Sequence, residues 1–225
     1  ARLGTGAARA AARHRLGRWS IPALAVLALV VLLSIGVTVG TLLRWLVLGG
    51  AGIWRLDLIG AALGQSVGYA LAGGVITTVL AVPMAWLTVR APGKLQRWLE
   101  AAHLYVGALP GIIVALALVS ITVRVALPLY QTAAALVFGY VLMFMPRALT
   151  GLRSSMAQAP VELERAAMSL GRPPMAAIWQ TTMRLAAPGV AASMALVALG
   201  VANELTGTLL LAPNGTRTLA TKFWA

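Results

Sequence analysis

The chain has 225 residues, is 60% hydrophobic and 10% charged, and carries a formal net charge of +13. Because a water-soluble domain carries roughly 25% charged residues, this composition disfavours a soluble protein and predicts an all-α, polytopic membrane protein. The absence of cysteine excludes disulfides, thiol catalysis and thiolate metal sites.

Residues 1–20 are rich in arginine and alanine and predict a basic cytoplasmic linker. The apolar run that follows, from Ile21 to Leu43, is too long for the core of a signal peptide and is typical of a membrane span. Residues 21–225 are therefore predicted to form one transmembrane domain. We expect it to be cut from a longer polypeptide and to be incomplete at its C-terminal end.

Hydropathy predicts about five spans, since about 20 mostly apolar residues cross a bilayer as a helix. The second is over-long and should tilt or extend beyond the bilayer. We expect kinks or broken turns at Pro83 in the second span and at Pro110-Gly111 in the third. GxxxG spacings, as at Gly60/Gly64/Gly68, favour close helix packing. The spans are approximately Ile21–Leu43, Leu58–Val89, Ala101–Val123, Thr132–Leu149 and Leu185–Leu211.

The basic residues orient these spans, because cytoplasmic loops carry an excess of lysine and arginine. With the N-terminus in the cytoplasm, thirteen of the eighteen basic residues fall inside. The opposite orientation would place those thirteen outside. This asymmetry explains the net charge, so no nucleic-acid partner is predicted.

The longest polar connection, residues 151–184, falls on the cytoplasmic side of this topology. Pro160 suits the start of a helix, and Gly171 followed by two prolines suits its end. A helix over Val161–Leu170 is too short to be stable alone in water. It must be held either by packing on its own bundle or by a partner, and alanines 166 and 167 would let another surface approach closely.

The spacing Glu164-x-Ala166-Ala167-x-x-x-Gly171, followed by Trp179, Thr182-Met183 and Pro188-Gly189, resembles the EAA loop of ABC importer permeases. That resemblance implies a coupling helix seated on a cytoplasmic ABC ATPase dimer. Two residues depart from the family pattern: Arg165 replaces a frequent second acid, and Arg184 replaces a frequent proline. The implied coupling residues are Glu162, Glu164, Arg165, Ala166, Ala167, Leu170 and Gly171.

The segment from Asn203 to Pro213, with Thr218–Thr221 and Phe223-Trp224, is similar to the C-terminal half of ferric-iron importer permeases. This implies a sixth span beyond the end of the chain and a second permease half, on the same polypeptide or on a homologous subunit. It also implies a periplasmic or lipid-anchored binding protein and a place in the bacterial inner membrane. Phosphonate, polyamine and thiamine permeases share the architecture, so these cargoes stay open.

The sequence contains no GxxxxGK[ST] motif, so ATP and Mg²⁺ are expected on the partner ATPase and the chain is not predicted to be an enzyme. No cofactor or metal ligand is assigned to it. The alternative from another class is a non-transporting membrane anchor or signalling subunit whose loop binds some other cytoplasmic protein.

Glu204 is the one acid in the last apolar run, and an ionisable residue inside a span indicates a functional site. With Asn203, Thr206 and Thr208 it is predicted to line the substrate path or a gate. Pro110-Gly111 would break the third span at this path, or alternatively form a simple packing kink. The alternative is that the fifth span ends early, which would leave Glu204 as a cap or an ion-pair partner in a wet outer vestibule.

Overall fold

The structure, a computed structural model, describes residues 17–50, 52, 54–91 and 93–224. All of its regular elements within these ranges are helices, which confirms the predicted all-α class. The chain divides into two compact units, residues 1–55 and 56–225.

The first unit contains one apolar helix that is long enough to cross a membrane. It confirms the first predicted span and begins a few residues earlier. Most of the predicted linker over residues 1–20 lies outside the described residues. The helix runs through η1 (Gly17–Trp19), α1 (Ser20–Val31), a π-helical stretch η2 (Leu32–Gly36) and α2 (Val37–Gly49).

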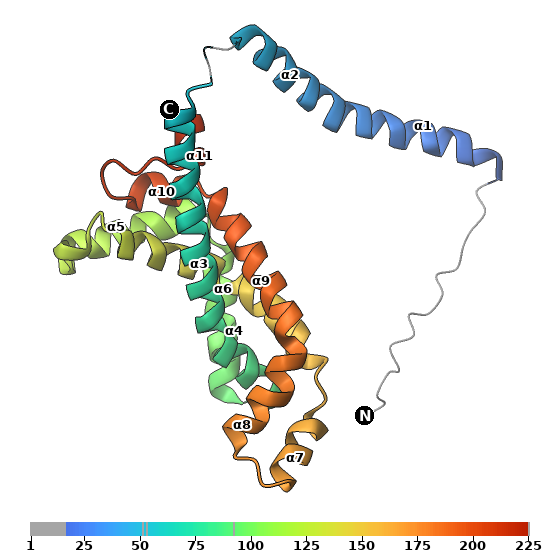
Figure 1. Ribbon diagram of the computed structural model, residues 1–225, viewed down its shortest axis with the longest axis vertical. Coiled ribbons are helices and arrows are strands. Elements are labelled where there is room, and N and C mark those ends of the chain that lie inside the picture. Colours follow the sequence, from blue (N-terminus) through green and yellow to red (C-terminus); the bar gives the residue numbers. More distant parts are fainter. Residues whose placement is uncertain (1–16, 51, 53, 92, 225) are drawn as a thin grey trace. The chain divides into compact units, whose positions relative to one another are not determined.

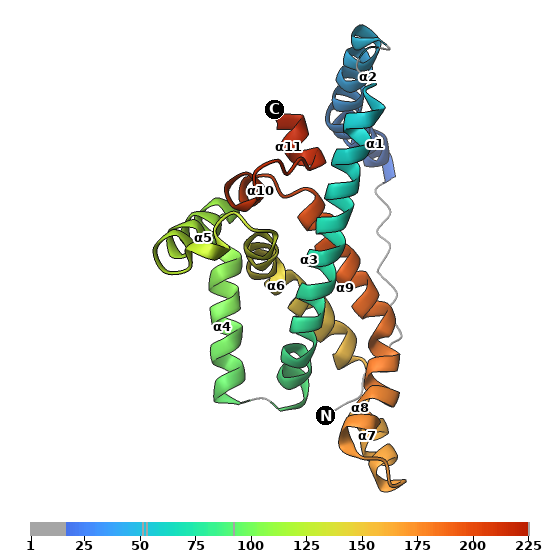
Figure 2. The same ribbon diagram turned by 60° about the vertical axis from the view of Figure 1, so that its left-hand side comes forward.

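The second unit is built on three long helices, α3 (Leu56–Arg90), α6 (Ala133–Ala157) and α9 (Arg184–Ala202), which pack side by side (Figures 1 and 2). The buried face of α3 carries only small residues, which lets the other two helices approach closely. The helix continues through Pro83 without a break. The small buried residues are Ala62, Ser66, Ala70, Gly73, Gly74, Thr77, Thr78, Ala81 and Ala85.

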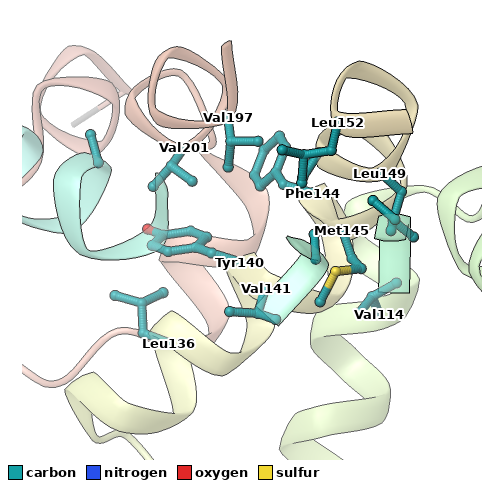
Figure 3. Close-up of a cluster of buried hydrophobic side chains, with 14 of the residues drawn as sticks. Val114, Leu136, Tyr140, Val141, Phe144, Met145, Leu149, Leu152, Val197 and Val201 are labelled. Atoms are coloured by element: carbon teal, nitrogen blue, oxygen red, sulfur yellow. The ribbon is translucent and has the colours of Figure 1, made fainter. Parts of the chain in front are cut away.

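Larger side chains of α6 and α9 fill the centre of this three-helix bundle (Figure 3). Tyr140, Leu136 and Leu152 of α6 are fully buried, as is Val197 of α9. Glycines mark the closest approaches of the two helices, where Gly151 faces a serine of α9 and Gly189 faces a serine of α6. At these two points a small residue of one helix therefore packs against a small residue of the other, and the two backbones come close.

The third predicted span is broken at Pro110-Gly111, where the sequence predicts a kink or a broken turn. Two helices, α4 (Lys94–Ala108) and α5 (Gly111–Val125), meet at an angle of 105°. Pro110 precedes the first residue of α5 and has an extended backbone, so the chain turns where the proline-glycine pair predicts a break. The short 3₁₀ helix η4 (Leu127–Leu129) then leads into α6.

The fourth and fifth spans differ from the predicted boundaries. Helix α6 continues eight residues beyond the predicted end at Leu149, to Ala157. The fifth span begins at Pro174 and ends at Ala202, through α8 (Pro174–Ile178), the π-helical η5 (Trp179–Met183) and α9. The connection between the two spans is therefore shorter than the predicted range 151–184.

Two short helices follow α9 at one end of the bundle, α10 (Thr206–Leu211) and α11 (Leu219–Trp224). At the opposite end lies α7 (Val161–Ser169), as both views show (Figures 1 and 2). Backbone N–H groups of Arg217 and Leu219 donate to Gln65 and Ser66 near the start of α3. The ends of α3 therefore mark the two ends of the second unit.

Candidate functional site

The short helix α7 has the boundaries that its flanking residues predict. Pro160 precedes it, and the last helical residue is Ser169. Gly171 has a φ of +84°, a conformation that glycine adopts without a steric penalty. The N–H of Gly171 donates to Met168 and that of Arg172 donates to Ala167, so the helix ends in a Schellman motif.

A buried polar network joins α7 to the ends of the long helices. Arg90, the last residue of α3, forms an ion pair with Glu164 at 3.0 Å, and its Nη2 donates to the carbonyl of Ala159 at 2.8 Å. The same nitrogen lies 3.3 Å from Oγ1 of Thr182, in η5. The Thr182 hydroxyl also donates to the Glu164 carboxylate. One carboxylate therefore ties α7 to α3 and to the last span.

Burial of this network makes it costly to open. Glu164 is 6% exposed and Thr182 is 1% exposed. A buried charge needs a partner and hydrogen bonds to offset the loss of hydration, and Glu164 has both. The network fixes the position of a nine-residue helix that would not be stable alone.

The other predicted coupling residues lie on the outer side of α7 and of its C-terminal turn. Glu162, Arg165 and Ala166 are exposed, and Ala167 is half-buried. Leu170 is 84% exposed, with the exposed side chain of Met168 beside it on the same helix end. The helix thus presents an apolar and charged surface to its surroundings while Glu164 faces inward.

At the other end of the bundle, Glu204 lies in a turn between α9 and α10. The prediction of a span continuing to Leu211 is wrong, because the helix ends at Ala202 and Glu204 follows two residues later. Its Oε1 accepts hydrogen bonds from the Thr206 hydroxyl at 2.7 Å and from the Gly207 N–H at 2.9 Å. The carboxylate therefore stabilises the N-terminal turn of α10.

The predicted break before α5 lies next to the turn after α9, where the fifth span stops short of its predicted end. A Cβ placed on Gly111, the first residue of α5, would lie 3.3 Å from Glu204 Oε1 and 3.5 Å from Thr206 Oγ1. The break between α4 and α5 thus contacts the break between α9 and α10. Gly111, Glu204 and Thr206 meet, whereas the Asn203 amide donates back to the carbonyl of Leu199 and lines, with Glu204, a groove between α6 and α9.

A buried hydrogen bond holds this outer turn to the core. The Tyr140 hydroxyl and the Thr208 hydroxyl are 2.7 Å apart, and Thr208 Oγ1 also lies 2.6 Å from the carbonyl oxygen of Glu204. Tyr140 belongs to α6 and Thr208 to α10, so the bond links a long helix to the turn. Thr208 is among the residues predicted to line the substrate path with Glu204, whereas Tyr140 is not.

Comparison with known proteins places this architecture in a family. Residues 59–224 match the family of binding-protein-dependent transport system inner membrane components. The chain belongs to this family. The resemblance to importer permeases that the sequence indicates is thereby confirmed.

Two relatives of this permease chain are transport system permeases with different cargoes. It is 36% identical over 197 residues to the Fe(3+)-transport system permease protein FbpB 2 of Haemophilus influenzae, covering 86% of this chain and 38% of that protein. It is 34% identical over 158 residues to the trehalose transport system permease protein SugB of Mycobacterium tuberculosis, covering 68% of this chain and 56% of that protein. The chain thus spans well under two thirds of either relative.

Two residues of the inner network are absent from the predicted coupling set. In the sequence Arg90 counts only as one more basic residue at the end of a span. Its position directly after a long apolar helix is a usable signal, because a cation there needs a partner or the headgroup region. Thr182 belongs to the motif that resembles the family, but its spacing alone does not show that its hydroxyl reaches Glu164.

Proposed function

We propose that this permease chain is a membrane-spanning part of an ABC importer and that α7 is its coupling helix on a cytoplasmic ATPase dimer. ATP and Mg²⁺ would bind to the ATPase, and this chain would carry no catalytic step. A periplasmic or lipid-anchored protein would deliver the cargo, and a second permease half would complete the path. The family match and the placement of α7 support this proposal.

The observation that carries the proposal is the network of Arg90, Glu164 and Thr182. A lever must transmit force, so its helix has to be fixed to the spans that it moves. The ion pair and hydrogen bonds attach α7 to α3 and to η5, while Met168 and Leu170 stay exposed for a partner. Closure of the ATPase dimer would then displace α7 and the ends of two long helices together.

The orientation follows from the same proposal. With α7 in the cytoplasm, Arg90 marks the inner end of α3, and Ser66, near its start, marks the outer end. These residues are about 36 Å apart along the helix, which is enough to cross a hydrocarbon core of about 30 Å. The N-terminal segment would then lie in the cytoplasm, in agreement with the excess of arginine there.

For the cargo we propose ferric iron. The relative from Haemophilus influenzae covers more of this chain, at slightly higher identity, than the trehalose permease does. The second relative makes a disaccharide the competing cargo. Phosphonate, polyamine and thiamine stay as alternatives on grounds of shared architecture.

The test of coupling is a substitution on the exposed side of α7. Ala166→Leu, in the complete protein reconstituted with its ATPase, should abolish transport-linked ATP hydrolysis because the larger side chain keeps the two surfaces apart. Ala134→Leu is the matched control. Ala134 is also an exposed alanine, but it lies at the start of α6, the end of that helix away from α7. Co-purification of the ATPase is measured alongside. Normal coupled hydrolysis in Ala166→Leu would contradict the assignment and favour an anchor or signalling role.

The cargo is tested by uptake into proteoliposomes that contain the complete importer and its binding protein. Ferric iron, trehalose, a phosphonate, a polyamine and thiamine are compared at equal concentrations. ATP-dependent uptake of iron alone supports the proposal. Uptake of trehalose but not of iron would make a sugar the cargo. The coupling proposal would not be affected by this result.

A further inference from the structure

An arginine lies within a helix that is predicted to cross the membrane. Arg147 is the fifteenth of the 25 residues of α6, about 15 Å along the helix from its C-terminal end. It packs against Gly200 of α9, and α9 carries no charged residue between Arg184 and Glu204. Gly200 is about 24 Å along the helix from Arg184. The guanidinium is therefore well removed from the end of the bundle that carries α7.

The Arg147 side chain packs against two specific residues, Phe144 and Gly200. Its guanidinium carbon lies 5.3 Å from the centre of the Phe144 ring, within range of a cation–π contact. A Cβ placed on Gly200 would come within 2.5 Å of Arg147 Nη1 and 2.6 Å of Phe144 Cε1. The missing side chain of Gly200 thus makes the room that the arginine and the ring occupy.

The arginine opens onto a mostly apolar groove that holds two other polar side chains. Arg147, Asn203 and Glu204 line it together with the edge of Phe144 and apolar residues of α9, and its volume is about 570 Å³. Among the described residues no carboxylate lies within 4 Å of the Arg147 nitrogens. The Glu204 carboxylate is held by Thr206 and Gly207. The groove therefore offers a cation that is seated but has no anionic partner in the described chain.

The groove that contains Arg147 is unsuited to contact with lipid. An arginine near the middle of a span is expensive in hydrocarbon and almost always faces a bundle interior or a water-filled cavity. Arg147 is exposed in this chain, and an amide and a carboxylate are the other two polar side chains of the groove. A water-filled passage satisfies all three groups at once.

We propose that the groove of Arg147, Asn203 and Glu204 is a cargo-binding site on the translocation path and that Arg147 contacts oxyanion groups of the cargo. This inference rests on the proposed importer function. The chemistry is that of a carboxylate or phosphate, which a guanidinium binds through paired N–H donors. A bare ferric ion would be repelled by Arg147, so iron would cross this site as a complex with oxyanion ligands.

The first experiment measures access to the groove and uses the absence of cysteine from this chain. Asn203→Cys, in an otherwise cysteine-free complete importer, should react with a membrane-impermeant thiol reagent. Citrate, inorganic phosphate or their ferric complexes should slow that reaction, and glycerol should not. Val79→Cys, on an exposed apolar position of α3, is the control and should stay unreactive. An unreactive Asn203→Cys would overturn the proposal.

The second experiment measures the charge. Arg147→Gln should raise the KM for uptake of ferric citrate or ferric phosphate about ten-fold or more, because a charge-assisted contact is lost. Arg147→Lys should recover part of the loss. Arg124→Gln, at the exposed end of α5, is the control and should leave the KM unchanged. An unchanged KM in Arg147→Gln would overturn the proposal. So would an Arg147→Gln variant in which part of the protein loses its second permease half while the complex that stays intact has a normal KM, because Arg147 would then serve assembly.

The two proposals fail in different ways. If the wild-type importer takes up no ferric complex, the iron assignment falls, while protection of Asn203→Cys by citrate or phosphate alone still supports an oxyanion site. If iron is taken up but neither anion protects the cysteine, the iron assignment stands and the oxyanion site is wrong. Comparing citrate with phosphate identifies which oxyanion the site prefers.

Discussion

Glu164 and Glu204 lie at opposite ends of the bundle of α3, α6 and α9. Each holds a short helix in place through side-chain contacts. Glu164 is buried and neutralised by the Arg90 guanidinium at 3.0 Å. Glu204 is partly exposed and accepts hydrogen bonds from a hydroxyl and a backbone N–H. The inner carboxylate therefore depends on one specific cation, whereas the outer one depends on local helix geometry.

This difference corresponds to different mechanical properties. A buried ion pair resists separation, because either charge alone is poorly solvated. A carboxylate bonded within its own turn can be released to water at lower cost, because water replaces the lost donors. We therefore expect the end that carries Glu164 to be rigid and the end that carries Glu204 to be more adaptable. In the proposed importer, these would be the inner end, suited to a lever, and the outer end, suited to a passage.

The largest expected effect comes from removing the cation at the inner end. Arg90→Ala leaves Glu164 buried with one hydroxyl donor, and we expect a loss of about 3 kcal/mol in the free energy of unfolding. Thermal unfolding in detergent, followed by tryptophan fluorescence, measures it. Arg97→Ala, at an exposed position of α4, is the matched control and should change stability by less than about 0.5 kcal/mol. Equal effects of the two substitutions would show that the ion pair contributes nothing.

Glutamine can replace the glutamate at either end of the bundle. Glu164→Gln loses the charge opposite Arg90, and we expect a cost of about 2 kcal/mol. Glu204→Gln keeps an acceptor for the Gly207 N–H and loses only the interaction with the helix end, about 0.5–1 kcal/mol. Unfolding midpoints of both variants, measured in one detergent, give the order. The reverse order would contradict the assignment of the inner end as the rigid one.

Local signals account for what the sequence predicts well. Pro160 and Gly171 define α7 through effects confined to a few residues, namely the missing N–H of proline and the positive φ of glycine. Pro110-Gly111 marks the break before α5 in the same way. The family resemblance rests on this same local spacing, which is why it appears without any knowledge of the packing.

Contacts between distant residues account for what the sequence leaves out. Arg90 and Glu164 are 74 positions apart, and nothing in hydropathy pairs them. The end of α9 is missed because Thr206–Leu211 is itself apolar and hides the break at Glu204. Glycine spacing is also ambiguous: Gly60, Gly64 and Gly68 have no close neighbour, whereas Gly73 and Gly74 contact α9. Only the packed structure distinguishes these glycines.

The smallest expected effect concerns the link between the outer turn and the core. Tyr140→Phe removes the hydroxyl that lies 2.7 Å from Thr208 Oγ1, and the Thr208 hydroxyl can still donate to the Glu204 carbonyl. Because Thr208 keeps a partner, no buried donor is left unsatisfied, and we expect a loss of about 0.5 kcal/mol. Unfolding midpoints of Tyr140→Phe, of Glu204→Gln and of the double variant form a cycle that measures whether the two residues stabilise the same turn. Additive effects would mean that they act separately, and the outer end would then be a looser assembly than the one inferred from its hydrogen bonds.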